Sequence, residues 1–487
     1  MFQRNLKPFP RLPNKDYTRS NVLATLFTPQ DNAKFSRFHL RSILITGMGV
    51  FSDGYDLSSI SVVLPLILTS FGIKKLDTVE SSLLAGSALA GAAIGALVFG
   101  QLANKGRKRY YGIDVSLMAV AGLAQAFVPN VMTLIVVRFI LGLGVGADYT
   151  LSPMIMGEHA NAKDRGKSMA LGFGVTWVIG ASVSALLDLS LTTMGASPNL
   201  VWRVVLGVSA LFPASVIYLR RKMPETTRYL ARIAGDSRSA TKIISEIDSV
   251  DEATTTERTI KDDNYISYYI RRDWKRFFAP IVLWFLFDIV AYSGILFGPS
   301  LIAKGIGLSA VSFSLLNTFL FTVPGALIGL SVLDRIGRRP VQIVGFLGMA
   351  GALLAFGLYS HSTTAMVPAL GLLLYGMQNL FSQGGPGSVS ASGLLGVELT
   401  PTKARGFVQG LTVAGGRIGA TIAAFVFPAL FKAYGESFAI YFLAAIATLA
   451  AILTLILVPE TKGLSLEESS KDVIIIDGTQ VPSFVEP

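Results

Sequence analysis

The sequence predicts an all-α membrane protein with twelve transmembrane helices in two pseudo-symmetric six-helix halves. Composition is the first reason: of 487 residues, 51% are hydrophobic and 15% are charged, whereas soluble proteins carry about 25% charged residues. The other reasons are a series of long apolar runs and an internal repeat. Together they indicate one body that is dissolved in lipid.

Twelve apolar runs approach the roughly 20 residues that a spanning helix needs. They begin near residues 42, 82, 111, 131, 168, 201, 277, 308, 341, 365, 407 and 437. One long charged break separates six runs from six. The predicted divisions are an N-terminal segment at 1–40, a first half at 41–220, a central loop at 221–275, a second half at 276–458 and a polar tail at 459–487.

Lysine and arginine concentrate in alternate loops, and such loops normally lie on the cytoplasmic side of a membrane. The loops at 103–110, 159–167, 334–339 and 400–405 are basic, as are the N-terminal segment and the central loop. We therefore expect a protein of the cell (plasma) membrane whose N- and C-termini are both cytoplasmic. The net charge of +11 is spread over these loops, so no nucleic-acid partner is expected.

Motifs recur at separations of about 230 to 240 residues, which predicts two related halves with a cavity between them. The recurring motifs are Glu158-x6-Arg165 with Glu398-x6-Arg405, Pro224-Glu225-Thr226 with Pro459-Glu460-Thr461, and the basic loops that follow Gly100 and Asp334. The glutamates and arginines of the first pair lie at span ends, where we expect them to act as conformational latches.

The residues that the sequence lacks exclude several chemistries. It has no cysteine, and its three histidines, His39, His159 and His361, lie far apart. The sequence therefore lacks the ligands for thiolate metal sites and iron–sulfur clusters, and a histidine-based triad is not expected. We expect no metal, no cofactor and no enzymatic activity; a membrane-embedded enzyme acting on a lipid phosphate would need carboxylate clusters at the membrane interface.

An ionisable side chain within a span costs about 2.5–3.5 kcal/mol to insert and is a candidate for function, and we select six such candidates. They are Asp53, Asp56, Arg138, Asp148, Asp288 and Arg417. Asp53 and Asp56 are three residues apart and share one helix face. Repulsion between two ionised carboxylates favours proton uptake by one of them, although a helix break beside a polar cavity would also explain the pair.

The fourth span contains Arg138, a Gly-x-Gly-x-Gly run and Asp148. The glycines resemble a dinucleotide-binding motif, but no strand precedes them, so close helix packing is the better interpretation. Ten residues separate Arg138 from Asp148, roughly 15 Å along a helix, which excludes a direct pair within it. Asp148 is therefore predicted to be a carboxylate of the cavity.

The seventh span places Trp284, Asp288 and Tyr292 at steps of four, on one stripe of a helix. An indole N–H and a phenol O–H beside a carboxylate make a compact hydrogen-bonding wall. In the eleventh span Arg417 lies among glycines, where an ion pair with an aspartate and direct contact with a substrate are equally compatible with the sequence.

These residues resemble the major facilitator superfamily and, more closely, its phosphate:proton symporter family. The resemblance covers residues 40–468 and rests on residues 47–56 (GMGVFSDGYD), 146–158 (GADYTLSPMIMGE), 284–292 (WFLFDIVAY) and 459–463 (PETKG). The substrate-binding residues that it implies are Tyr149, Trp284, Asp288 and Tyr292. The proton-coupling residues that it implies are Asp53, Asp56 and Asp148.

Three positions depart from the family pattern. A fifth-span glutamine of the family falls at Thr176, and a tenth-span asparagine motif is replaced by a stretch that begins at Gln383. Both residues are included among the candidate substrate-binding residues. Asn104 stands in the first basic loop where an aspartate is usual. Arg138 and Arg417 are possible charge partners of the aspartates.

The sequence therefore predicts a proton-coupled secondary transporter that imports inorganic phosphate by alternating access and functions as a monomer in the bilayer. A carboxylate at Asp288 would accept the O–H of protonated phosphate and repel a fully deprotonated anion such as sulfate. The alternatives are a proton-coupled sugar or organic-acid transporter of the same superfamily and a non-transporting nutrient sensor. A sugar site would favour several amide side chains, and the seventh span has none near Asp288.

Overall fold

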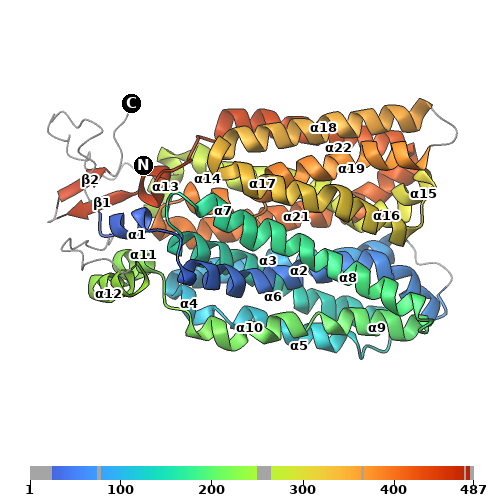
Figure 1. Cartoon of the computed structure of the whole chain (residues 1–487), viewed down its shortest axis with the longest axis horizontal. Helices are drawn as coiled ribbons and strands as arrows, with labels where there is room; N and C mark the ends of the chain where they lie inside the picture. Colours follow the sequence, from blue (N-terminus) through green and yellow to red (C-terminus); the bar gives the residue numbers. More distant parts are fainter. Residues whose placement is uncertain (1–24, 74–77, 249–264, 363–366, 477–478, 483–487) are drawn as a thin grey trace, which may run out of the picture.

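A computed structural model describes residues 25–73, 78–248, 265–362, 367–476 and 479–482. It is a bundle of long helices in which a first and a second half lie side by side (Figure 1). The helices of the first half are α2 (Arg37–Ser70), α3 (Thr78–Leu102), α5 (Ile113–Gln125), α6 (Val131–His159), α7 (Arg165–Met169), α8 (Thr176–Thr193), α9 (Pro198–Val208) and α10 (Leu211–Lys222). A π-helical turn at Ala170–Val175 joins α7 to α8.

The second half has the same number of spanning segments. Its helices are α14 (Trp274–Phe297), α15 (Ala303–Ile306), α16 (Ala310–Asn317), α17 (Val323–Ile336), α18 (Arg338–Ser362), α19 (Pro368–Ser382), α21 (Thr402–Tyr434) and α22 (Glu436–Leu457). Three π-helical turns interrupt or extend them, at Gly298–Ile302, Thr318–Thr322 and Gln383–Gly387.

Ten continuous helical stretches within the described residues are long and apolar enough to cross a membrane. The third and tenth positions of the predicted twelve are taken by α5, with 13 residues, and α19, with 15 residues. Large apolar side chains such as Leu44, Val120, Leu123 and Leu358 remain exposed on the outer helices, as contact with lipid requires. The all-α, twelve-helix membrane fold is confirmed.

Short elements gather at one end of the bundle, which we call the basic end because loops 103–112, 159–167 and 334–339 lie there (Figure 1). These elements are a 3₁₀ turn at Ala103–Lys105, α1 (Thr28–Asn32), α4 (Arg107–Tyr110), α11 (Thr227–Tyr229), a π-helical turn at Leu230–Ala234, α12 (Ser237–Asp248), α13 (Tyr265–Arg272), α20 (Leu394–Glu398), α23 (Leu466–Ser470), and the antiparallel strands β1 (Val473–Ile476) and β2 (Thr479–Pro482). The polar tail of the sequence analysis thus contains a helix, α23, with Leu466 and Glu467 buried.

The sequence repeat corresponds to a repeated local structure at the basic end. Gly106 and Gly337 precede α4 and α18, and both have a positive φ, 134° and 117°, that side chains rarely tolerate. The carboxylate of Glu225 accepts a hydrogen bond from the backbone N–H of Lys108 at 3.0 Å. Glu460 accepts the equivalent bond from the backbone N–H of Arg339 at 3.1 Å and a further one from that of Arg338 at 3.0 Å. Each half therefore uses its Pro-Glu-Thr glutamate to cap a helix N-terminus, where negative charge is stabilising.

Small residues bring neighbouring helices into backbone contact. A Cβ at Gly146 of α6 would lie 1.9 Å from the carbonyl oxygen of Ala92 on α3, and one at Gly142 would lie 2.0 Å from that of Ala88. The helix-packing interpretation of the Gly-x-Gly-x-Gly run is therefore confirmed.

Candidate functional site

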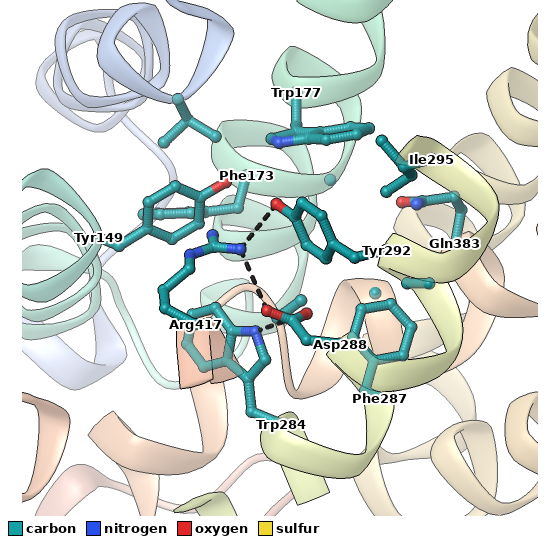
Figure 2. A pocket seen from close by; sticks show the side chains of 15 residues that line it. Tyr149, Phe173, Trp177, Trp284, Phe287, Asp288, Tyr292, Ile295, Gln383 and Arg417 are labelled. Carbon is teal, nitrogen blue, oxygen red and sulfur yellow. Dashed lines mark hydrogen bonds and ion pairs between the residues drawn. The ribbon is translucent and has the colours of Figure 1, made fainter. Parts of the chain in front are cut away.

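A small cavity lies between the two halves and takes its walls from both (Figure 2). The first half contributes α2, α6, the π-helical turn Ala170–Val175 and α8, and the second half contributes α14, the turn Gln383–Gly387 and α21. Its volume is about 40 Å³, where one water needs about 10–15 Å³, so this conformation accommodates only a small solute. The lining residues are Val50, Tyr149, Phe173, Gly174, Trp177, Trp284, Phe287, Asp288, Ala291, Tyr292, Ile295, Gln383, Gly387, Ala391 and Arg417.

Asp288 is the carboxylate of this cavity, and both of its oxygens are engaged. The indole N–H of Trp284 donates to one oxygen at 3.1 Å, and Arg417 Nη1 donates to the other at 3.1 Å. The same Nη1 donates to the Tyr292 hydroxyl at 2.7 Å. The i, i+4 stripe on α14 thus forms one wall with Arg417 of α21, and all four side chains are buried.

Arg417 is positioned by aromatic rings as well as by the ion pair. Its guanidinium carbon lies 4.3 Å from the ring centroid of Tyr149 and 5.4 Å from that of Tyr292, which is a favourable cation–π geometry. Figure 2 shows the guanidinium between these rings and Asp288. Arg417 Nε has no hydrogen-bond partner. The wall therefore combines a paired carboxylate with a cation that keeps an unused N–H, and both chemistries are needed to hold a partly protonated anion.

Most of the predicted substrate-binding residues meet at this cavity, but Thr176 does not. Its hydroxyl donates to the Gly172 carbonyl at 2.7 Å, and a Cβ at Gly47 of α2 would lie 2.9 Å from its methyl group. The neighbouring Trp177 lines the cavity instead. Thr176 therefore packs against α2, which corrects its predicted place in the cavity wall.

Asp53 and Asp56 lie on one helix but in different surroundings. Both Asp53 oxygens are buried without a hydrogen-bond partner among the residues that the structure describes. Asp56 accepts from the Gln125 amide at 3.3 Å, and the amide oxygen of Gln125 accepts from Arg138 at 3.2 Å. Arg138 therefore reaches Asp56 through Gln125, while Asp53 is left without a compensating bond.

Asp148 does not line the cavity, and this corrects its predicted role as a cavity carboxylate. Its Oδ1 accepts from Arg220 of α10 and from Ser152, each at 2.5 Å. Arg220 also donates to Asp114 of α5 at 2.6 Å. The sequence analysis assigned no role to Asp114 or Arg220; Arg220 is the first residue of the basic run Arg220-Arg221-Lys222.

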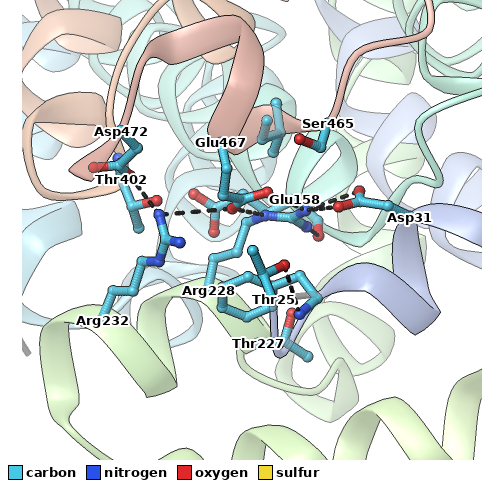
Figure 3. A network of polar contacts seen from close by, with 12 residues as sticks. Thr25, Asp31, Glu158, Thr227, Arg228, Arg232, Thr402, Ser465, Glu467 and Asp472 are labelled. Atoms are coloured by element: carbon cyan, nitrogen blue, oxygen red, sulfur yellow. Dashed lines mark hydrogen bonds and ion pairs between the residues drawn. The ribbon is translucent and has the colours of Figure 1, made fainter. Parts of the chain in front are cut away.

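At the basic end a buried network joins segments far apart in the sequence (Figure 3). Arg228 donates to both oxygens of Asp31 at 2.9 Å and to the two oxygens of Glu467 at 2.9 and 3.2 Å. Arg232 donates to Asp472 at 2.7 Å. Burial alone would raise the pKa of Glu467, but Arg228 and Arg232 outweigh burial and hold that pKa at about 2.

The repeated Glu-x6-Arg motifs cross between the halves. Glu158 of the first half accepts from Arg405 of the second at 2.6 Å and from Arg107 at 2.7 Å. In reciprocal fashion, Arg165 of the first half lies 3.5 Å from Glu398 of the second. These buried ion pairs hold the basic end closed in this conformation.

A two-half helical bundle around a cavity between the halves is the architecture of a membrane transporter. The sequence pattern of the family described as sugar (and other) transporter matches residues 42–472. The chain belongs to this family of the major facilitator superfamily.

Known relatives and solved structures extend over most of the chain. The rice protein named inorganic phosphate transporter 1-6 (Oryza sativa subsp. japonica) is 33% identical, over 91% of this chain and 94% of the relative. Rice inorganic phosphate transporter 1-1 is 32% identical, over 93% and 97%. The solved proton:xylose symporter XylE, bound to 6-bromo-6-deoxy-D-glucose, shares the fold with a TM-score of 0.73 at 22% identity, over 88% and 98%.

Proposed function

We propose that the chain is a proton-coupled symporter that imports inorganic phosphate, and that it acts as a transporter rather than as an enzyme. The observation that carries the proposal is the wall of the central cavity, where Asp288 and Arg417 stand together with Trp284 and Tyr292. The names of the relatives support the same cargo. Residues 41–220 would rock against 276–458 around the cavity.

The two charges give the site a selectivity that neither gives alone. The guanidinium of Arg417 attracts an oxyanion, while Asp288 accepts the O–H that phosphate keeps near neutral pH. Sulfate has no such O–H, so Asp288 would repel it. The proposed substrate-binding residues are the cavity-lining Tyr149, Trp284, Asp288, Tyr292, Gln383 and Arg417.

We propose that Asp53, Asp56 and Asp148 carry the proton coupling, with Asp53 as the group nearest the cargo. A buried carboxylate without a compensating bond is strongly disfavoured in its charged form, and both Asp53 oxygens are in that condition. The charges of Asp148, Arg417 and Asp56 act on Asp53. Protonation there would reduce the negative charge next to the cavity and favour anion entry.

The basic end is proposed to face the cytoplasm of a cell whose plasma membrane holds the protein as a monomer. Lysine and arginine crowd the loops at that end, and such loops stay on the cytoplasmic side. The ion pairs between Glu158 and Arg405 and between Arg165 and Glu398 close that end. The conformation is therefore assigned to the part of the cycle in which the cytoplasmic path is shut.

Counterflow in proteoliposomes tests the proposed cargo. Vesicles loaded with unlabelled phosphate should accumulate labelled phosphate, whereas vesicles loaded with sulfate, xylose, glucose or succinate should not. The family description and XylE make a sugar the main competitor. Accumulation driven by a sugar or a dicarboxylate, with none driven by phosphate, would overturn the proposal.

A further inference from the structure

Three charged side chains form a buried cluster beside the cavity, within the first half. Arg220 of α10, Asp114 of α5 and Asp148 of α6 are each 0% exposed. Arg220 Nη1 donates to Asp114 Oδ2 at 2.6 Å and to Asp148 Oδ1 at 2.5 Å. None of the three lines the central cavity, so the cluster is not part of the proposed substrate wall.

The two carboxylates of the cluster are held in different ways. Both Asp114 oxygens are engaged, because Oδ1 accepts the backbone N–H of Gly112 at 2.6 Å while Oδ2 accepts Arg220. Asp148 Oδ1 accepts Arg220 and Ser152, but Oδ2 is buried without a hydrogen-bond partner. Among the described residues, Asp148 therefore has one oxygen that accepts no hydrogen bond, whereas both oxygens of Asp114 are engaged.

The free oxygen of Asp148 faces α2. A Cβ at Gly49 would lie 2.3 Å from Asp148 Oδ2, so only glycine fits there. Asp53 lies four residues further along α2, about 6 Å at 1.5 Å per residue, and both its oxygens are without a partner. A proton on Asp148 would thus lie about one helical turn of α2 from Asp53.

Other charged groups near Asp148 come from each packed element. Arg220 donates to the Thr46 carbonyl of α2 at 3.2 Å and lies 4.4 Å from the Tyr111 ring centroid. Arg417 of α21 acts on the adjacent Tyr149. The face of α3 that meets α6 consists of small residues such as Ala88 and Ala92. Within the described residues, the charged or titratable groups that face Asp148 are therefore Asp53, Asp114, Arg220 and Tyr111.

The net charge of Asp114, Asp148 and Arg220 determines how the cluster responds to a proton. Two carboxylates and one guanidinium leave one negative charge, which a single proton on Asp148 cancels. Arg220 then still has Asp114 as its partner. If Asp148 were the sole partner, its protonation would leave a buried cation unpaired, which is strongly unfavourable.

We propose that Asp114 is a fixed counter-ion for Arg220, and that it allows Asp148 to gain and lose the transported proton while Arg220 stays paired. The inference rests on the proposed proton-coupled function. Asp114 and Arg220 are then positioning residues: they set the proton affinity of Asp148 without touching phosphate. The proton passes between Asp148 and Asp53, and no other bond is made or broken.

The test is the pH dependence of phosphate uptake by proteoliposomes under an inward proton gradient. In Asp114→Asn, Asp148 remains the sole carboxylate partner of Arg220, so protonation of Asp148 is disfavoured. The pH at which uptake is half-maximal should therefore move toward acid by about one pH unit or more. Arg220→Gln removes the cation and should move the midpoint toward alkali. Asp188→Asn, the same change at another buried aspartate of the first half, should leave the midpoint unchanged.

Phosphate exchange at equal pH on both sides serves as the folding control for each variant. If Asp114→Asn also loses phosphate exchange, the double variant Asp114→Asn/Arg220→Gln distinguishes the explanations, because it also removes the guanidinium that has lost a partner. The double variant should regain exchange, and the pH midpoint of its uptake should lie on the alkaline side of that of the wild type. An unchanged midpoint in Asp114→Asn, shifts of both single variants in one direction, or a double variant without exchange would overturn the inference. Wild-type protein that moves no phosphate would instead overturn the proposed function.

Discussion

Asp288 and Asp53 are the same chemical group in the same kind of place, yet the protein treats them differently. Asp288, in the second half, receives Trp284 and Arg417 on its two oxygens and lines the cavity. Asp53, in the first half, is 0% exposed and has no hydrogen-bond partner on either oxygen. A buried carboxylate must be neutralised by a cation or by a proton.

The difference indicates a division of labour between the halves. We propose that Asp288, paired with Arg417, stays ionised as a receptor for the O–H of phosphate. We propose that Asp53, which has no such partner among the described residues, is neutralised by a proton and changes charge when that proton leaves. The second half would thus supply the substrate wall and the first half the proton path, so that their relative movement couples the two.

The largest expected effect follows from removing the charge of Asp288. In Asp288→Asn the buried Arg417 loses its partner, and breaking a buried pair in this way costs about 3–5 kcal/mol. We expect phosphate uptake and phosphate exchange to fall by about 100-fold or more, while the protein still inserts into the membrane. Asp188→Asn is the matched control. Full uptake by Asp288→Asn would remove Asp288 from the mechanism.

Removing the other partner should make Asp288 resemble Asp53. In Arg417→Gln the carboxylate loses its cation, so it should take up a proton. Infrared difference spectra should then show an additional protonated carboxyl band, and Asp288→Asn/Arg417→Gln should lack it. Apparent phosphate affinity should fall by about tenfold, as expected for one lost charged hydrogen bond of about 1.5 kcal/mol. Absence of the band would break the comparison between the two aspartates.

A smaller effect is expected at the basic end, where charge holds the halves together. Glu158→Gln removes the carboxylate shared by Arg107 and Arg405. Arg405 still donates to the carbonyls of Val397 and Thr400, so the effect should be modest. We expect the basic end to open about tenfold more often, which corresponds to about 1.4 kcal/mol of free energy.

Opening can be followed by thiol labelling because the sequence has no cysteine. Val397 is 0% exposed and faces Gly157 across the interface between the halves, so Val397→Cys should be labelled only when the basic end opens. Glu225→Gln, which affects a contact between the central loop and Lys108 of the first half and, among the described residues, none between the halves, is the control. Equal labelling rates in all three backgrounds would argue against a latch.

The smallest effect concerns acid stability. The pKa of Glu467 is held at about 2 because Arg228 and Arg232 outweigh burial, whereas an unfolded glutamate titrates near 4.3. The contribution of ionised Glu467 to the free energy of unfolding is therefore complete above about pH 4.3 and is lost as the pH falls toward 2. The melting temperature should decline over that window, and Glu467→Gln should flatten the decline. Asp31 has the opposite effect on stability: burial raises its pKa, so its protonation at low pH favours the folded state.

The sequence predicted what depends on local spacing and missed what depends on rotation or distance. The stripe Trp284, Asp288 and Tyr292 follows from steps of four along an uninterrupted helix. Thr176 was proposed because a glutamine of the similar family falls at its position, and such a match does not say which side of the helix faces the cavity; Thr176 does not line it. Trp177 faces it instead.

Ion pairs between residues far apart in the sequence could not be predicted from the spacing of residues along one helix. The spacing correctly excluded a pair between Arg138 and Asp148, but it could not supply Arg220, which is 72 residues away in sequence. For Arg417 two roles stayed open, and the structure shows the ion pair with Asp288. A buried arginine at the end of a span, such as Arg220, has no local signature that separates it from a basic loop.

The division of labour is tested most directly by Asp53→Asn in proteoliposomes that contain a pH-sensitive dye. With its neutral amide, the variant should exchange phosphate at a rate comparable to wild type, because the wall around Asp288 is intact. Addition of phosphate should then move no protons. Protons that accompany phosphate at the wild-type ratio in this variant would contradict the account.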